Sequence, residues 1–437
     1  MRLRNWFELL AKEWRELLAT RSFWLLLLMI GPLVGYGFIT AVNLYAEASG
    51  SGGAPAALPQ GLTPLDGMLA PVLGAYDLAA MFLFPFIAIR LIAGEKQSGA
   101  LKLLLQLPGS LSGKVALKGV IFVAGWFVAL LPGLIAMTLW KFYGGHLYGP
   151  ETFNLLLGHL LRALLSGGIA VAAASIAESA ASAAIITLGI TVGTWAVDFM
   201  AAARGGWLQE LATYTPTAAL RFFEQGLLRL STVLVMLAIS VAGFALAVVW
   251  LHTGRTMRFR AAATAAVTVI VAIIIIGCAG LKMSWDLSEN HRNSFAAADE
   301  AILRQIKQPL RITVFLSADD PRLTDFEQNV LRKLRRSFAH LDVAYAAAGR
   351  TGLFAGADDH YGEIWYEMNG RKLSERSTIE EVVLEQIYQL AGVSAPQQRD
   401  DTQFSGYPLA AQPKHAALLF YFLWPLLTIV AWWWLRR

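Results

Sequence analysis

The chain carries little charge for its length. Only 15% of its 437 residues are charged, whereas 56% are hydrophobic. Soluble globular chains have about 25% charged residues. This shortage excludes an ordinary soluble protein and predicts a membrane protein whose charges are concentrated in a few segments. The single cysteine, Cys278, excludes an intramolecular disulfide, so cysteine usage does not indicate a redox compartment.

Catalytic and cofactor motifs are also missing from the sequence. The stretch Gly109–Val115 is one residue too short between its glycines for a Walker A loop, and Val115 replaces the Ser or Thr that would hold Mg²⁺. The seven histidines are scattered without metal-ligand spacing. No basic-aromatic stretch indicates nucleic-acid binding. We therefore expect no enzyme activity, cofactor, metal or nucleic acid, and any ATP hydrolysis to occur in another polypeptide.

Eight apolar runs stand out in the sequence, and each approaches the roughly 20 residues that a helix needs to cross a membrane. They are Phe23–Val42, Val72–Ala93, Val120–Trp140, Leu155–Ile176, Ala180–Met200, Ser231–Leu251, Ala262–Leu281 and His415–Leu435. The sequence therefore predicts an α-helical polytopic membrane protein with about eight spans.

Positive charges favour one side of these spans. If the N-terminus is cytoplasmic, the cytoplasmic segments hold Arg2, Arg4, Lys12, Arg15, Arg21, Lys96, Lys102, Lys114, Lys118, Arg255, Arg258, Arg260, Arg436 and Arg437. The short outer loops hold Lys141, Arg204, Arg221 and Arg229. The positive-inside rule then places both termini in the cytoplasm and Lys282–Lys414 outside. The positive excess also favours contact with anionic membrane lipid.

The segment Lys282–Lys414 differs in composition from the rest of the chain. It holds 16 Lys or Arg residues against 19 Asp or Glu residues, and the remainder holds 20 against 12. The dipeptide Asn369-Gly370 favours a type I′ hairpin turn, and Thr378 with Glu381 forms a capping box. We expect an extracytoplasmic α/β domain with helices over Ser294–Gln308, Arg322–His340 and Thr378–Leu390, strands over Arg311–Ser317 and Leu341–Tyr345, a hairpin around Asn369-Gly370, and a linker over Ser394–Lys414.

A polar loop with a short amphipathic stretch separates the second and third spans. The loop Gly94–Gly119 holds four lysines, yet Leu101 and Leu103–Leu105 give it an apolar face. Pro108-Gly109 ends the stretch. Such a helix lies in the membrane interface and presents a polar face to the cytoplasm. A plain solvated loop is the alternative.

The same loop resembles the signature of permeases of the type-2 ABC exporter family. The matching residues are Arg90, Glu95, Gly99, Leu101, Leu103, Leu104, Pro108 and Lys118. In that family the loop supplies the coupling helix, which rests on a separate ATPase subunit. The resemblance implies the following ATPase-coupling residues: Glu95, Lys96, Gly99, Leu101, Lys102, Leu104 and Pro108.

Two further segments are similar to the same family, and with the loop they cover the first six spans. Leu10–Trp24 resembles the amphipathic elbow helix before the first span, and Thr213–Leu228 resembles the outer segment before the sixth. Thr215 stands where the family usually has Leu or Ser. The matching positions of the outer segment are Pro216, Phe222 and Gly226.

The region after the seventh span has a likeness of its own. Trp285–Phe295, followed by Pro309–Ser317, resembles the start of the auxiliary domain in the gliding-motility-associated ABC transport system. That domain usually belongs to a separate membrane subunit. Here it would be fused to the permease and shortened, because the chain returns to the membrane at His415.

These resemblances imply a modular chain: an elbow helix (1–22), a six-span permease domain (23–251), a linker with the seventh span (252–281), an auxiliary domain (282–414), and the eighth span with a basic tail (415–437). They imply a permease subunit of an ATP-driven export system in a bacterial inner membrane. Its expected partners are an ABC ATPase, a second permease in a homodimer or heterodimer, and an extracytoplasmic partner. A non-transporting scaffold or sensor is the alternative, and a proton-driven transporter is a third.

Two charges within the predicted spans need a partner or water. Asp77 in the second span and Arg162 in the fourth lie at depths that agree within about 3 Å. Because burying a charge in a membrane is costly, we predict that they pair or line a shared cavity. Separate snorkelling to the interface is the alternative. Ile275–Cys278 resembles a lipoprotein cleavage box, but its internal position favours an ordinary span end.

Overall fold

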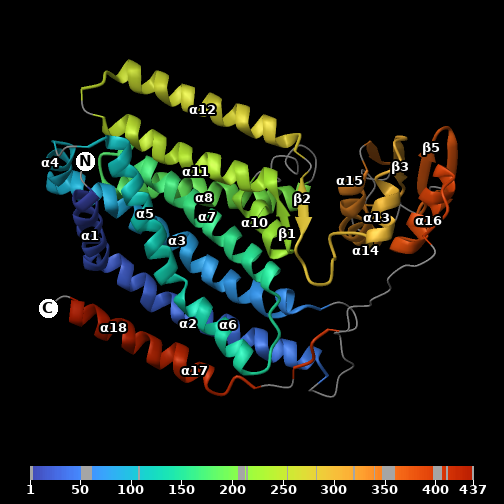
Figure 1. Cartoon of the computed structure of the whole chain (residues 1–437), viewed down its shortest axis with the longest axis horizontal. Coiled ribbons are helices and arrows are strands. Elements are labelled where there is room, and N and C mark those ends of the chain that lie inside the picture. The colour runs from blue at the N-terminus through green and yellow to red at the C-terminus, as the bar shows by residue number, and fades with distance from the viewer. Residues whose placement is uncertain are drawn as a thin grey trace. The chain divides into compact units, whose positions relative to one another are not determined.

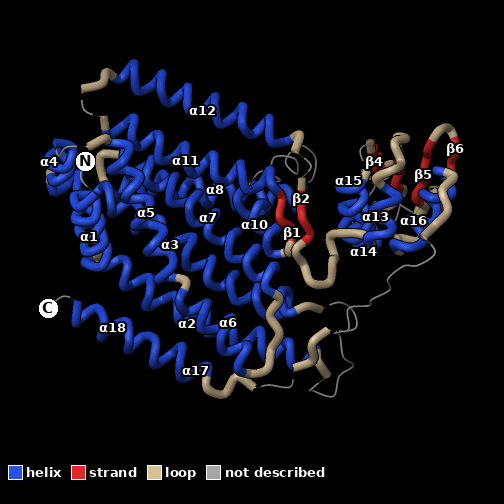
Figure 2. The backbone as a smooth tube through the Cα atoms, in the orientation of Figure 1, coloured by secondary structure: helices blue, strands red, loops and turns tan. Residues whose placement is uncertain are grey.

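The computed structural model describes residues 3–50, 62–106, 109–204, 212, 215–252, 254–281, 283–317, 320–338, 340–346, 360–396, 406–409 and 412–435. Pro108, one of the predicted coupling residues, lies outside them. The chain divides into two compact units, Met1–Leu287 with Ser405–Arg437, and Ser288–Phe404. The first unit is almost entirely helical, whereas the second combines helices with a sheet (Figure 1; Figure 2).

Eight helices in the described part of the chain are long and apolar enough to cross a membrane, as predicted. They are α2 (Arg21–Ala48), η2 with α3 (Leu65–Leu69, Ala70–Ser98), α5 with α6 (Leu111–Ala129, Leu131–Phe142), α7 (Gly149–Ile176), α8 (Ala180–Arg204), α11 (Leu230–Leu251), α12 (Met257–Ala279), and α17, η5 and α18 (Ala416–Leu418, Leu419–Leu423, Trp424–Leu435). The shorter elements are α1 (Leu3–Ala19), α4 (Ala100–Gln106), α10 (Pro216–Glu224), and strands β1 (Leu227–Arg229) and β2 (Ser284–Asp286), which pair antiparallel. The chain is thus a multi-pass helical membrane protein.

The helices extend beyond the apolar runs, most clearly in the third span. It begins at Leu111, well before the predicted Val120. Hydropathy counts Lys114 and Lys118 against a span, but both side chains are buried and hydrogen-bonded, Lys114 to the Leu104 carbonyl and Lys118 to Glu13. A buried charge with a partner avoids the cost that hydropathy assigns to it. Hydropathy alone therefore places the start of this helix too late.

Helix α7 is central to the first unit and packs against α3, α8, α10 and α11. Its closest approach is to α11, where Gly168 faces Gly243. A Cβ atom added at Gly168 would lie 2.7 Å from the carbonyl oxygen of Ser240. Small residues let the backbones of membrane helices come this close. The fourth and sixth spans are therefore fixed to each other by direct backbone packing.

The last span packs against the first, and Figure 1 shows α18 alongside α2. Trp424 Nε1 donates a 2.7 Å hydrogen bond to the carbonyl oxygen of Leu27. Gly31 and Gly35 of α2 leave the space that the side chains of Trp424 and Phe420 fill. By contrast, α12 has extensive contacts with α11 alone among the described spans, and only 6% of its most apolar 18-residue stretch is buried.

The second unit is a small α/β domain around a four-stranded sheet of order β4-β3-β5-β6. Strand β3 (Leu310–Val314) is parallel to β4 (Leu341–Tyr345) and antiparallel to β5 (Ile364–Met368), which pairs antiparallel with β6 (Arg371–Glu375). Alternate residues of β3 and β5 enter the core. The helices are α13 (Ala297–Leu303), α14 with η3 and α15 (Pro321–Phe326, Glu327–Leu331, Arg332–Ser337), and α16 (Glu380–Ala391).

Two local predictions in this unit have opposite outcomes. The hairpin is confirmed, because Asn369 and Gly370 have φ angles of 52° and 76°, as a type I′ turn requires. The capping box is wrong. The N-cap residue of α16 is Ile379, without a side-chain bond, and Thr378 Oγ1 instead bonds Asp325 of the neighbouring helix at 3.5 Å. The helix predicted over Ser294–Gln308 is confined to Ala297–Leu303.

Replacing Gly243 with alanine should loosen the contact between α7 and α11, because the added methyl group has no room against the backbone of Gly168. Overpacking of this kind costs about 1–3 kcal/mol, so the thermal midpoint of the detergent-purified protein should fall. Gly277→Ala on α12 is the control, since a Cβ there meets nothing within 4 Å. Equal midpoints for the two variants would contradict the close approach.

Candidate functional site

Four charged side chains form a closed ring that joins α1 to the end of α3 and the start of α5. We name Lys12, Glu13, Glu95 and Lys118 the elbow ring. Lys118 Nζ lies 2.8 Å from Glu13 Oε2 and 2.9 Å from Glu95 Oε2. Lys12 Nζ lies 2.7 Å from Glu95 Oε1 and 3.1 Å from Glu13 Oε1. The side chains of Glu13, Glu95 and Lys118 are 1%, 6% and 3% exposed, so the ring is largely buried.

The ring balances two positive against two negative charges, and its two glutamates and Lys118 are shielded from water, whereas Lys12 is partly exposed. An isolated ion buried here would cost several kcal/mol, but each member has two oppositely charged neighbours within the ring, and Lys12 has a third in Glu16. Burial alone would lower the pKa of Lys12. The hydrogen bond to Glu95 and the negative charge of Glu13 outweigh this effect of burial, so the pKa of Lys12 is raised above its ordinary value. Lys12 therefore stays protonated at neutral pH, and α1 is held against α3 and α5.

Lys96 extends these connections to α7. Its Nζ donates to the carbonyl oxygens of Ala177 at 2.6 Å and Ser175 at 3.0 Å, where α7 ends. The last carbonyl groups of a helix lack partners within the helix and carry partial negative charge, which a lysine stabilises. The end of α3 is thus fixed to the end of α7.

Helix α4, in the predicted coupling loop, has one buried and one exposed side. Leu101 and Leu104, three residues apart, lie on the same face of the helix, and both are buried. Lys114 Nζ donates to the carbonyl oxygen of Leu104 at 2.7 Å. Lys102 and Leu103 are exposed, and the side chain of Leu103 is 68% exposed. The helix therefore presents its outward side from a fixed base.

The predicted coupling residues accordingly differ in placement. Glu95, Lys96, Leu101 and Leu104 point inward, and Gly99, with a φ angle of 75°, ends α3. Of these five residues, Glu95, Leu101 and Leu104 are buried, Lys96 is half-buried and Gly99 is exposed. Lys102 is on the outward side of α4, next to Leu103. Leu103 is part of the family signature but is not one of the predicted ATPase-coupling residues.

Sequence reasoning missed Glu13 and Lys118 as partners of the loop. The available signal was the position of Glu13, three residues after Leu10 and four before Leu17 on an amphipathic helix. Residues at these spacings share a face, so Glu13 stands on the apolar stripe. A carboxylate in such a place requires a buried cationic partner.

The elbow ring offers no space for a metal ion. Glu13, Glu16 and Glu95 have carboxylate oxygens within 4.8 Å of one another. The ammonium group of Lys12 already lies 3.1, 3.0 and 2.7 Å from oxygens of these three residues, respectively. The lysine occupies the position that a cation would take.

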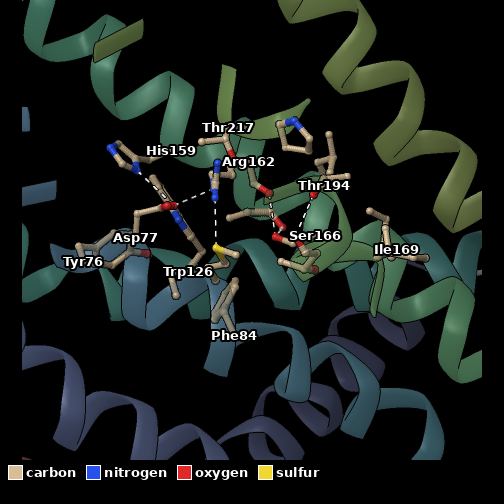
Figure 3. Close-up of a pocket in the computed structure, with 17 residues that line it drawn as sticks. Tyr76, Asp77, Phe84, Trp126, His159, Arg162, Ser166, Ile169, Thr194 and Thr217 are labelled. Atoms are coloured by element: carbon tan, nitrogen blue, oxygen red, sulfur yellow. Dashed lines mark hydrogen bonds and ion pairs between the residues drawn. The ribbon is translucent and has the colours of Figure 1, made fainter. Parts of the chain in front are cut away.

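The structure brings the predicted intramembrane pair together. Arg162 Nε lies 3.0 Å from Asp77 Oδ1, and Figure 3 shows the two side chains meeting. His159, one turn earlier on α7, has Nδ1 3.8 Å from the same oxygen. We name Asp77, His159 and Arg162 the Asp77 cluster. Their side chains are 17%, 0% and 10% exposed, which does not fit separate snorkelling.

Aromatic side chains and a small cavity surround this cluster. The rings of Tyr76 and His159 meet edge to face with centroids 6.2 Å apart. Phe84 and Trp126 help to line a cavity of about 40 Å³ (Figure 3), which has room for a few water molecules. Arg162 Nη1 and both ring nitrogens of His159 have no hydrogen-bond partner among the described residues. The cavity therefore places polar groups of α7 beside space for water.

His159 was not predicted as a site residue. Its spacing to the other six histidines does not fit a metal site, but it lies three residues before Arg162. In a helix this spacing puts both side chains on one face. The signal was the partnership with the arginine, not a metal-ligand pattern.

Helix α10, which precedes the sixth span, lies close to the cluster. Helix α10 starts where Thr215 Oγ1 accepts a hydrogen bond from Ala218 N, and the same hydroxyl donates to Asp198 Oδ1 at 2.6 Å. Thr215 is thus the N-cap of α10. At the other end of α10, burial raises the pKa of Glu224, opposed by the charge of His159 and reinforced by that of Asp77. Four acid–base side chains of three helices are thus electrostatically linked.

A second cavity, of about 710 Å³, adjoins the first. The two share five lining residues: Leu165, Ile169, Ile190, Thr194 and Pro216.

Comparison with family models, curated proteins and solved structures gives no match for this chain. The functional argument therefore rests on its motifs and on this geometry.

Breaking the elbow ring at Lys118 should strongly destabilise the first unit. Lys118→Met leaves the two ring glutamates with one lysine, and removing one partner of a buried ion pair costs about 3–5 kcal/mol. The double variant Glu13→Gln/Lys118→Met keeps the balanced pair of Lys12 and Glu95, so it should recover part of the loss in thermal unfolding. The exposed Lys141→Met is the control. Additive losses in the double variant would show that the two residues do not interact.

The pairing of Asp77 with Arg162 is testable in the same way. Asp77→Asn and Arg162→Gln each leave one buried charge without its partner and should lower the thermal midpoint, by about 3–5 kcal/mol in stability. The swapped variant Asp77→Arg/Arg162→Asp should be more stable than either single variant. Exposed Arg221→Gln is the control. A swapped variant no more stable than the single ones would refute the pairing.

Proposed function

We propose that the chain is the permease subunit of an ATP-driven, ABC-type export system in a bacterial inner membrane, and that a separate ATPase subunit docks on the outward side of α4. The observation that carries this proposal is the elbow ring. It fixes α1, α3 and α5 to one another beside an exposed short helix. A surface helix on a rigid base suits the transmission of motion, whereas a solvated loop would absorb it.

Force applied to α4 has a short route into the spans. Lys114 holds α4 to α5, and Lys96 connects the end of α3 to the end of α7. Helix α7 in turn carries His159 and Arg162 of the Asp77 cluster. ATP binding would draw two ATPase subunits together, and only contacts that differ between the two states can shift the equilibrium of the spans. The α4 surface would supply such contacts.

In this proposal both termini and α4 are cytoplasmic, and the segment 282–414 is an extracytoplasmic auxiliary domain. The distribution of Lys and Arg supports this orientation. Two copies of the chain, or this chain with a second permease, would enclose the path along which the exported substrate crosses the membrane. The most apolar windows of α8 and α12 are only 11% and 6% buried, which leaves apolar surface for lipid or for a second permease.

A non-transporting scaffold or sensor is the second candidate. It is favoured by the independent core of the second unit, in which the sheet and its helices bury residues such as Ile312, Phe326 and Ile387. A domain with its own core can bind an extracytoplasmic partner without any ATPase. The presence or absence of an associated ATPase separates the two candidates.

The double variant Lys102→Glu/Leu103→Asp should lose the ATPase without unfolding, because both side chains are exposed. The control Lys141→Glu/Phe142→Asp makes a matched change at the opposite end of the third span, where both residues are also exposed. We would purify tagged chains from native membranes and quantify co-purified ATPase by mass spectrometry.

The expected result is an ATPase with the wild type and the control, and about tenfold less with the α4 variant, which corresponds to about 1.4 kcal/mol. Similar thermal midpoints for both variants would show that the loss is local. An ATPase retained equally by both variants would place the docking surface elsewhere. No ATPase with the wild type would reject the exporter and favour the scaffold.

A further inference from the structure

The cavity of about 710 Å³ is lined by residues of α7, α8, α10, α11 and α12, together with Thr215 and Arg229, and it is partly open. Its volume falls within the roughly 300–1,000 Å³ of small-molecule binding sites. Along α11 it extends from Ser231 to Ile239, which is about 12 Å at 1.5 Å per residue. Half of a bilayer's hydrocarbon core is about 15 Å thick. The cavity is therefore about as deep as one membrane leaflet.

Two glycines of α8 keep the cavity wide. Gly189 and Gly193 lie four residues apart on one helix face, and both line the cavity. A Cβ atom added at either would meet nothing within 4 Å. These glycines differ from Gly168 and Gly243, which allow two backbones to touch. Gly189 and Gly193 therefore leave open space on the α8 side of the cavity.

The two ends of the cavity differ in chemistry. Arg229 lines one end with Thr215, Ser231 and Thr232, and its guanidinium lies 4.6 Å from the centre of the Phe222 ring. The other end is formed by apolar side chains: Leu165, Ile169, Ile190 and Ile239. The described lining residues include this one arginine and no carboxylate. One end thus carries a guanidinium group and several hydroxyl groups, and the other is apolar.

We propose that this cavity binds a membrane amphipath with an anionic head and an apolar tail. The guanidinium of Arg229 has five N–H donors in a fixed fork that suits carboxylate and phosphate groups. The tail lies along Gly189 and Gly193 toward Ile169. Only Ile275 and Cys278 of α12 line the wall, and that helix is largely exposed, so the ligand enters from the lipid along α12. This inference concerns ligand binding and does not depend on ATPase docking.

The test uses the full-length chain in detergent and counts retained ligands by native mass spectrometry. One arm compares phosphatidylglycerol with phosphatidylcholine of the same acyl chains, and the other compares oleate with methyl oleate. A charge-assisted bond from Arg229 should give the anionic member of at least one pair about a tenfold advantage. A preference in the first arm identifies a phosphate head, and one in the second identifies a carboxylate head.

Variants separate the head site from the tail site. Arg229→Gln should abolish the anionic preference, whereas the exposed Arg221→Gln should keep it. Gly189→Phe and Gly193→Phe should reduce binding of every ligand, and the open space at both positions lets the chain fold. Equal retention within both pairs by the wild type would overturn the proposal, as would an anionic preference that survives Arg229→Gln. Because no ATPase is present, a failed ATPase pull-down leaves this result unaffected.

Discussion

The first unit depends on one closed ring of buried charges. Lys12, Glu13, Lys118 and Glu95 alternate in sign, and three of them are almost completely buried. No member can leave alone without stranding an opposite charge, which costs several kcal/mol. The amphipathic first helix is therefore a fixed part of the helix bundle and does not float at the membrane surface. The rigidity of α4, and with it the proposed coupling, follows from this constraint.

Helices α3 and α7 are joined at two separated points. Lys96 fixes α3 to the carbonyl end of α7, and Asp77 of α3 pairs with Arg162 of α7. Lys96 and Asp77 are about 28 Å apart along α3 at 1.5 Å per residue. Two helices connected at such separated points can tilt together, but they cannot slide past each other. A rotation that begins at α4 would therefore reach the Asp77 cluster with little loss.

The sequence predicts features that depend on local pattern or on membrane depth. The eight spanning helices follow from apolar length, the hairpin from Asn369-Gly370, and the meeting of Asp77 with Arg162 from their similar depth. Contacts between distant segments were not predictable in this way. The bond from Lys118 to Glu13 joins residues 105 positions apart. The capping box at Thr378 is absent because α16 begins one residue later, with Ile379 as its N-cap, and the Thr378 hydroxyl faces Asp325 of a different helix. The large cavity also escapes sequence reasoning, because Gly189 and Gly193 look like ordinary small residues of a span.

The packing of α18 on α2 has a consequence for the order of assembly. Gly31 and Gly35 form a shallow groove in the first span, and its occupants are Trp424 and Phe420. The bond from Trp424 to Leu27 joins residues 397 positions apart. During synthesis α2 is thus made long before the residues that fill its groove. The packing surface of α2 is therefore completed only when α18 has been made.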